Sequence, residues 1–432
     1  MAKSGYLSRT LYHKVERQVD PATGRQYDLR NVALVPYWTY SSYGYDSDLD
    51  GLSNYEELLL GTAPQNNDTD ADGLYDGWEV YGHNWVDYPA LGADPLHKDI
   101  FLELDYHAAV KPSQAVLTKL TELWATLDIP NPDGVQGIAL HPILDDVLPE
   151  TNAQGAEYDC KTDHYDVWDR DTRTGWPYFD AIHRGGFYYG QVCLGPLKSD
   201  GSRQTGGGGW EGGFYIKISP TNSDPDDDMT ERMQHSYYQM IAHELGHAVG
   251  LLHGGYEGMP CKPNYHSVMN GEAYTEVSWG GTNTLAGSRM DYSRGEFVGF
   301  PLDETALHEY PALPGLPASA RNVLTFFGVN TPTRPTDVNP IKTGFRVSGS
   351  WIDWNGDSSY AGTPIAFDIT NAGSECATPV RLQFLEDAID SDIIRAALPV
   401  NVKSRAPFDG PHPAFPFKTP TAPPEPCMTE VL

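Results

Sequence analysis

The alternation of apolar and polar positions predicts a β-sheet in the middle of the chain. Asp99 to Asp105 read Asp-Ile-Phe-Leu-Glu-Leu-Asp, and this near alternation of apolar and acidic residues is typical of a strand. We expect further strands at residues 135–144 and 214–219. Residues 112–127 predict an amphipathic helix between the first two strands, because one side of it carries Val116, Leu117, Leu120 and Leu123.

A second, longer helix is predicted to end at about Val249. Asp224 is a candidate N-cap and Pro225 suits the first helical position. The aspartates at 226–228 follow in the first turn, where the helix dipole favours negative charge. Residues 206–213 are rich in glycine, and we expect a flexible loop there. No Gly-Lys-Ser/Thr follows this loop, so it does not indicate a phosphate site.

The composition is that of a folded, strongly acidic protein. The 432 residues suffice for two or three domains, and 40% hydrophobic residues allow a substantial core. The net charge of −30 makes nucleic acid and anionic membrane surfaces poor partners, because phosphate binding needs a basic surface. The sequence contains no run of about 18 apolar residues, so it predicts no transmembrane helix. Calcium is the obvious counter-charge.

Two acidic loops follow the pattern of the twelve-residue calcium loop. The first offers Asp46, Asp48, Asp50, the Leu52 carbonyl, Asn54 and Glu57. The second offers Asp68, Asp70, Asp72, the Leu74 carbonyl, Asp76 and Glu79. A solvated acidic turn is the alternative, but two full matches in tandem favour two or more structural calcium ions. The short spacing resembles the calcium-stapled repeats of thrombospondin type 3 rather than paired helix–loop–helix hands.

The most specific motif is His-Glu-x-x-His-x-x-Gly-x-x-His, from His243 to His253. His243 and His247 share one face of a helix, about 6 Å apart along its axis, so both can reach one zinc ion. Gly250 can adopt a positive φ and turn the chain, which brings His253 back as the third ligand. Three histidines with an open fourth position describe a catalytic zinc site. Glu244 lies beside the metal, placed to take a proton from zinc-bound water.

Neither the other histidines near the motif nor the cysteines are predicted to bind the metal. His235 and His266 lack the needed spacing, so we do not expect them to bind the metal. The five cysteines show no metal-binding spacing. Cys160–Cys193 and Cys376–Cys427 are candidate disulfides in an oxidising compartment, which leaves Cys261 over.

The histidine motif resembles that of the metzincin clan of zinc endopeptidases. That clan has a methionine turn beneath the metal, and either Met269 or Met290 could provide it here. Lys262-Pro263-Asn264-Tyr265 and Ser267-Val268-Met269-Asn270 resemble a group of microbial secreted metzincins in which the first methionine is the turn. The resemblance therefore favours Met269. The alternative for either methionine is ordinary core filling.

A transition-state donor is harder to place. Astacin-like and serralysin-like metzincins have a tyrosine two residues beyond the methionine. Gly271 stands there after Met269, whereas Tyr292 stands there after Met290. Tyr292 is therefore the candidate donor.

These features together predict an α+β protein in five segments. The resemblance implies a metzincin-like mixed, twisted sheet with a long active-site helix. We expect an N-terminal segment without assigned role (1–40), calcium-binding repeats (41–95), a catalytic domain (96–310), a proline-rich linker (311–340) and a small β-rich module with a proline-rich tail (341–432).

The predicted function is zinc-dependent hydrolysis of peptide bonds in protein or peptide substrates, with calcium stabilising the fold. The alternatives are a calcium-dependent extracellular binding protein with a non-catalytic zinc site, and a delivered protease toxin. An intact Glu244 argues against a purely structural zinc. The N-terminus has no apolar segment typical of a signal peptide, yet the calcium loops favour an extracellular protein. The sequence gives no rule for cleavage specificity or oligomeric state.

Overall fold

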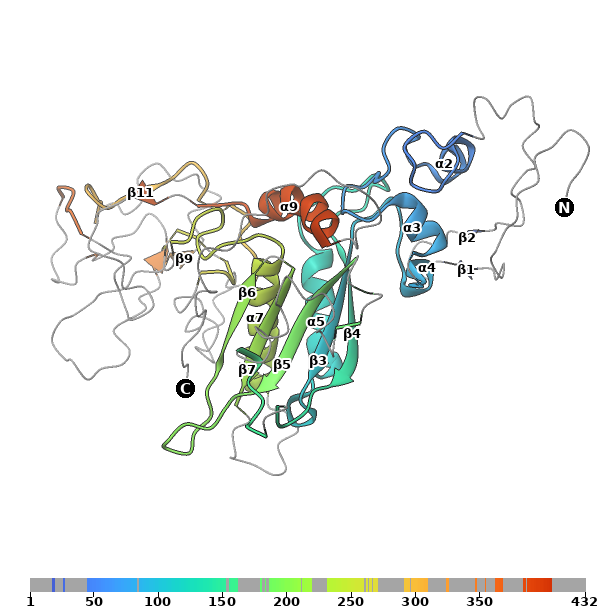
Figure 1. Cartoon of the computed structure of the whole chain (residues 1–432). Coiled ribbons are helices and arrows are strands. Elements are labelled where there is room, and N and C mark those ends of the chain that lie inside the picture. Colours follow the sequence, from blue (N-terminus) through green and yellow to red (C-terminus); the bar gives the residue numbers. More distant parts are fainter. Residues whose placement is uncertain are drawn as a thin grey trace, which may run out of the picture.

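A five-stranded sheet forms the centre of the described structure (Figure 1). The computed structural model describes most of residues 45–161, 179–219, 231–270, 291–309 and 384–405, together with residues 362–367, Trp354 and several two-residue strands. The strand order is β4 (Ala139–Val147), β3 (Asp99–Tyr106), β5 (Phe187–Leu194), β7 (Gly213–Ile218) and β6 (Gly206–Trp210). All neighbours are parallel except β6, which is antiparallel to β7 and lies at an edge. This mixed α and β content is compatible with the predicted α+β class.

Two helices, α5 (Gln114–Ala125) and α7 (Glu231–Ala248), contact each other and pack against the sheet (Figure 1). Ser113 caps α5, because its hydroxyl accepts a hydrogen bond from the Val116 backbone N–H at 3.3 Å. The core between helices and sheet includes Leu102, Leu104, Val116, Leu120, Trp124, Ile216, Ile241 and Leu245. Burial of these side chains fixes the second half of α7 beside β6 and β7.

The other described elements are short. The acidic repeats contain α2 (Asn54–Leu60), α3 (Asp76–Tyr81) and α4 (Tyr88–Leu91), and the 3-10 helix η2 (Ala108–Val110) follows β3. Two-residue antiparallel pairs join β1 (Gln18–Val19) to β2 (Gln26–Tyr27), β9 (Leu324–Thr325) to β10 (Arg346–Val347), and β8 (Leu302–Asp303) to β11 (Phe384–Leu385). Leu74 and Tyr88 belong to the same core as the sheet, so the repeats pack onto it.

The predicted strands are confirmed, with one shifted boundary and one wrong assignment. β3 and β7 match the expected residues, whereas β4 begins only at Ala139. Gly137 causes this shift, because it makes a turn with a φ of 105° and donates its N–H to the Ile129 carbonyl. The expected flexible loop at 206–213 is wrong for Gly206–Trp210, which forms β6. The N-cap predicted at Asp224 lies outside the described residues.

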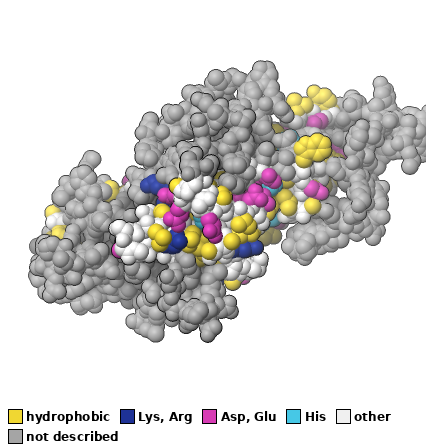
Figure 2. Space-filling model, turned by 60° about the horizontal axis from the view of Figure 1, so that its bottom comes forward, with side chains coloured by type: hydrophobic (Ala, Val, Ile, Leu, Met, Phe, Trp, Pro, Cys, Tyr) yellow, Lys and Arg dark blue, Asp and Glu magenta, His cyan; other side chains and the backbone are white. Residues whose placement is uncertain are grey.

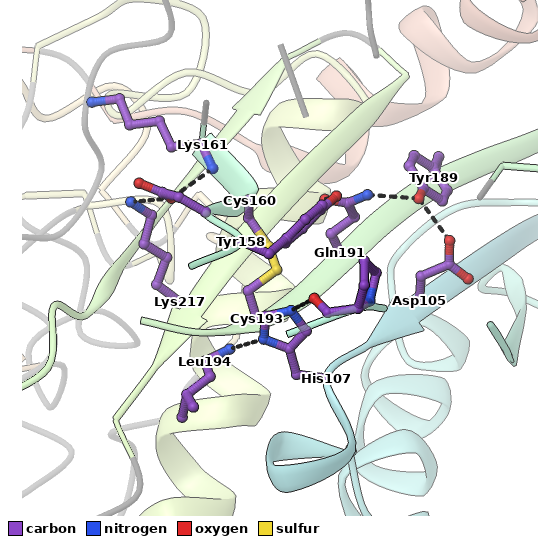
Figure 3. Close-up of a disulfide and its surroundings, with 12 residues drawn as sticks. Asp105, His107, Tyr158, Cys160, Lys161, Tyr189, Gln191, Cys193, Leu194 and Lys217 are labelled. Carbon is purple, nitrogen blue, oxygen red and sulfur yellow. Dashed lines mark hydrogen bonds and ion pairs between the residues drawn. A yellow bond between two sulfur atoms is a disulfide. The ribbon is translucent and has the colours of Figure 1, made fainter. Parts of the chain in front are cut away.

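A disulfide links β5 to the segment at Cys160 (Figure 3). The expected Cys160–Cys193 pair is formed, with the two Cα atoms 6.1 Å apart. Beside it, the Tyr158 hydroxyl donates to Gln191, Gln191 donates to the Tyr189 hydroxyl, and that hydroxyl donates to Asp105. The chain of hydrogen bonds leaves these buried polar groups satisfied. Cys261, Cys376 and Cys427 lie outside the described residues.

Helix α9 (Asp390–Arg405) is an element that the sequence reading missed. A β-rich module was expected there, and that expectation is wrong for these residues. Ile394 and Leu398 lie one turn apart on the same face, and both are buried in the core that contains Met269. Asp392 and Arg395 remain largely exposed on the other side of the helix. The start of α9 is therefore part of the main fold.

Asp390, at the beginning of α9, joins three distant segments. Its side chain is fully buried and accepts hydrogen bonds from the Tyr265 hydroxyl at 2.7 Å and the Ser267 hydroxyl at 2.5 Å. It also accepts the backbone N–H of Ser293 at 2.7 Å. Hydrogen bonds to a buried carboxylate are stronger than those between neutral groups. Asp390 therefore holds the segment around Met269 against α9.

The described surface is mixed in character on the face shown in Figure 2. Acidic side chains are interspersed there with hydrophobic ones, and the basic side chains do not form a continuous patch on the described part of that face. Among the described helices, none combines the length and the apolar character needed to span a membrane.

The Asp390 contacts generate the first prediction. We expect Asp390→Ala to lower the free energy of unfolding by about 3 kcal/mol or more, because three donors lose their buried acceptor. Asp392→Ala, two residues further along the same helix, is the matched control and should change stability by at most about 1 kcal/mol. Denaturant unfolding followed by tryptophan fluorescence measures both. Equal stability of the two variants would contradict the role given to Asp390.

Candidate metal centres

Helix α7 and the turn after it bring three histidines together. One ring nitrogen each from His243, His247 and His253 lies within 4.8 Å of the others. The Nε2 atoms of His247 and His253 are 3.2 Å apart. Gly250 has a φ of 103°, as the sequence predicted, and its backbone turns the chain back toward the helix. The predicted histidine triad is therefore assembled, and it could hold a metal ion.

Backbone carbonyls orient two of the three rings. His243 Nδ1 lies 2.8 Å from the Val268 carbonyl oxygen, and His247 Nδ1 lies 2.7 Å from the Leu251 carbonyl oxygen. A proton on each Nδ1 leaves Nε2 with a free lone pair, which is the form that binds metals. His243 Nε2 is buried and has no hydrogen-bond partner among the described residues. A metal ion would supply the partner that this nitrogen lacks.

Burial also sets the charge of the site. Burial and, to a smaller extent, the nearby His253 lower the pKa of His243 to about 3. Burial likewise holds the pKa of His247 well below its usual range. Both imidazoles are therefore neutral near pH 7, as ligands must be. Glu244 is fully buried, neither of its carboxylate oxygens has a hydrogen-bond partner among the described residues, and burial raises its pKa well above the usual range.

The glycines of β6 allow that strand to lie directly on the histidine helix. A Cβ atom at Gly207 would overlap the Glu244 carboxylate. One at Gly209 would stand 2.6 Å from the Glu244 carbonyl oxygen and 2.7 Å from His247 Cβ. Only glycine fits at such distances. The glycine-rich stretch read from the sequence as a loop is thus a wall of the site, and this functional role was missed.

Met269 lies against the opposite side of α7. It is fully buried, and a side chain on Gly246 would overlap its sulfur atom. The Ser267 hydroxyl accepts the Met269 backbone N–H at 3.1 Å, and Ser267 is itself held by Asp390. Met269 therefore packs against α7 at Gly246, and its role as a methionine turn stays a prediction. The alternative, Met290, lies outside the described residues, as do His266 and the side chain of His235.

Tyr292 does not match the role expected for it. Its hydroxyl donates to the Ala242 carbonyl oxygen at 2.6 Å, and its ring packs edge-on against Trp124. The side chain is only 1% exposed. These contacts make Tyr292 a support beneath α7, and they do not fit a transition-state donor.

The second acidic loop gathers buried carboxylates around one point. Asp68, Asp70 and Asp72 have carboxylate oxygens within 4.8 Å of one another. Glu79 is buried, and neither of its oxygens has a hydrogen-bond partner among the described residues. Burial raises the pKa of Glu79 well above its usual range, and Asp72 adds to this effect. Leaving such groups charged and unpaired is costly, so the cluster fits a hard cation.

The second loop is also tied to the sheet. The Asp72 carboxylate accepts the backbone N–H of Asp99 at 2.7 Å, and the Lys98 ammonium donates to the Asp70 carbonyl oxygen. Asp99 and Lys98 stand at the start of β3. No local pattern in the sequence predicts this link between the repeats and the sheet.

The first acidic loop has a different arrangement. Asp46, Asp48 and Asp50 have carboxylate oxygens within 4.8 Å of one another, as expected. The Asn54 side chain faces Ser47, because its Oδ1 accepts the Ser47 N–H and its Nδ2 donates to the Ser47 hydroxyl. Burial raises the pKa of Glu57 to about 8, with Asp48 adding to it, and burial raises the pKa of Asp50 to about 7. The loop can therefore hold a cation, although Asn54 is engaged elsewhere.

A further group of donor atoms lies on the sheet. One possible ligand atom from each of Glu103, Asp145 and His183 lies within 4.8 Å of the other two. The two Glu103 oxygens already have partners, since they accept the Asp180 N–H at 3.2 Å and lie 2.5 Å from His183 Nδ1. Ordinary hydrogen bonding explains this group.

Comparisons with family models, with curated proteins and with solved structures find no match to this chain.

The contact between β6 and α7 generates the second prediction. We expect Gly209→Ala to lower the free energy of unfolding by about 1–3 kcal/mol, because the added methyl meets helix atoms that cannot move aside. Gly258→Ala is the matched control, since its Cβ would have no neighbour within 4 Å. Denaturant unfolding should show a loss only for Gly209→Ala. A Gly209→Ala variant as stable as the control would refute the close approach.

Proposed function

We propose that this chain is a zinc-dependent endopeptidase of the metzincin clan that cleaves protein or peptide substrates. The observation that supports it best is the convergence of His243, His247 and His253 on one point, with the buried Glu244 directly after His243 in α7. Three converging imidazoles suit zinc, and a buried acid that has no hydrogen-bond partner among the described residues suits proton transfer.

The chain's own residues divide the chemistry among them. When bound, zinc supplies a Lewis acid that polarises the scissile carbonyl and lowers the pKa of a coordinated water to about 7. A Glu244 carboxylate oxygen accepts a proton from the attacking water and passes it to the leaving nitrogen. The Val268 and Leu251 carbonyls keep His243 and His247 in the metal-binding orientation.

Strand β6 supplies a surface for the substrate. It lies at the edge of the sheet and pairs with β7 on one side only among the described strands. An extended peptide can add to such an edge through backbone hydrogen bonds. The contact of Gly207 and Gly209 with α7 would bring that peptide close to Glu244 and the histidines.

Calcium on the two acidic loops would stabilise the fold rather than take part in the chemistry. The buried oxygens of Glu57 and Glu79, which have no hydrogen-bond partner within the described part of the chain, support this role. Loops of this kind in extracellular modules often bind calcium at about 10⁻⁴–10⁻³ M. The Cys160–Cys193 disulfide also fits an oxidising compartment. We propose on these grounds that the protein works outside the cytosol.

Replacing the proposed base tests the mechanism. Glu244→Gln should keep the fold and the bound zinc, but turnover of casein should fall about a hundred- to ten-thousand-fold, the usual contribution of general acid–base catalysis. Purified wild type and variant are compared for zinc content and for hydrolysis at equal protein concentration.

His253→Ala is the companion variant, and it should lose zinc together with activity. If Glu244→Gln hydrolyses casein as fast as the wild type does, Glu244 is not the general base. Full zinc content in His253→Ala would show that His253 is not the third zinc ligand.

Calcium removal tests the stabilising role. The Glu244→Gln variant cannot digest itself, so its melting temperature is measured with calcium between micromolar and millimolar, at fixed zinc. Each ion should add roughly 2.7 kcal/mol of stability at a hundredfold excess over its Kd. We therefore expect the melting temperature to rise across the millimolar range. An unchanged melting temperature would contradict stabilisation by calcium.

A further inference from the structure

The two acidic loops contact each other at a point that loop-by-loop reading does not anticipate. Asp50 and Glu57 belong to the first loop, whereas Asp76 belongs to the second, yet their carboxylate oxygens lie within 4.8 Å of one another. Their exposed fractions are 6%, 0% and 0%. Three buried carboxylates from two loops therefore surround one small volume.

Glu57 indicates that a cation belongs there. Both of its oxygens are buried, and neither has a hydrogen-bond partner among the described residues. Burying an unpaired carboxylate costs several kcal/mol. A cation between Glu57, Asp50 and Asp76 would satisfy these groups at once.

Two hydrogen bonds from Thr69 fix the position of the Asp76 carboxylate. Its two oxygens accept hydrogen bonds from the Thr69 N–H at 2.7 Å and the Thr69 hydroxyl at 2.6 Å. A carboxylate offers about four lone-pair sites, so each oxygen can still bind a cation. Asn54, the equivalent residue of the first loop, faces Ser47 in the same way. The first loop thus has a neutral amide at this position, and Asp76 provides a charged oxygen in its neighbourhood.

The contact between the loops is tight. The Gly77 backbone N–H donates to Asp50 Oδ2 at 3.1 Å, and a side chain at Gly77 would overlap the Asp50 carbonyl oxygen. The Tyr81 hydroxyl donates to Glu56 at 2.8 Å, which adds a second link between α3 and α2. The start of α3 is therefore held against the first loop.

We propose that Asp76 of the second loop is a ligand of the calcium ion held by Asp50 and Glu57 of the first loop. This inference rests on the calcium part of the proposed function. The first site is complete only when the second loop is folded, so ion binding to the second loop strengthens binding to the first. The two repeats thus act as one coupled unit and not as two independent sites.

Paired substitutions in the full-length Glu244→Gln chain test the assignment. Calcium chloride is titrated by calorimetry, with Glu57→Gln removing the first ion and Glu79→Gln removing the second. Asp76→Asn should weaken one ion by about tenfold or more, because it removes a charged ligand. When Asp76→Asn is combined with Glu57→Gln, one calcium ion should still bind, with little further loss of affinity. When Asp76→Asn is combined with Glu79→Gln, no calcium ion should bind tightly.

The opposite pattern would overturn the proposal. If Asp76→Asn with Glu79→Gln still binds one ion tightly, Asp76 serves its own loop. A starting chain that binds no calcium removes this inference and the stabilising role of calcium, while casein hydrolysis by wild type still reports on the zinc site separately.

Gly77→Ala is the second variant, since it keeps Asp76 and only pushes α3 away from Asp50. It should weaken the same ion as Glu57→Gln does. Unchanged affinity of both ions in Gly77→Ala would contradict the shared site. Circular dichroism at saturating calcium checks that every variant is folded.

Discussion

The close packing of α7 on both sides is the constraint on which the histidine site depends. Gly207 and Gly209 let β6 touch the helix from one side, and Gly246 lets Met269 touch it from the other. Between these contacts the helix has little freedom to shift or rotate, so His243 and His247 keep a fixed direction. Protein interiors are packed too densely to absorb even one added methyl group without strain. The positions of the histidines therefore depend on residues that carry no reactive group.

The histidine site and the acidic loops share one physical property. In each, the fold removes polar atoms from water that have no hydrogen-bond partner among the described residues, as at His243 Nε2, both Glu244 oxygens and both Glu57 oxygens. Native proteins bury such atoms rarely, because each one costs free energy. The core formed by the sheet and the helices supplies the favourable burial that offsets this cost. Cations would then return part of that free energy, which links metal binding to the stability of the whole fold.

Local patterns predicted much of this structure. The strands at β3 and β7, helix α5, the histidine triad and the turn at Gly250 all follow from short-range periodicity and spacing. Residues 206–210 were misread, because glycine indicates flexibility locally, whereas its use here is set by a helix in contact with it. The pairing of Asp76 with Asp50, and that of Asp390 with Ser267, could not be predicted either. Such contacts depend on the tertiary fold, and no local pattern in one sequence encodes them.

The hydrogen bond between Asp390 and Ser267 spans 123 residues of chain, and this separation has a consequence for biosynthesis. Ribosomes add about 5–20 residues per second, so residue 390 emerges roughly 6–25 seconds after residue 267. During that interval the histidine helix can already form, but the segment beneath it lacks the acceptor that holds it. The support beneath the site is therefore completed only after a further 123 residues have been added. In a nascent chain, the contacts beneath the histidine helix are incomplete until residue 390 has left the ribosome.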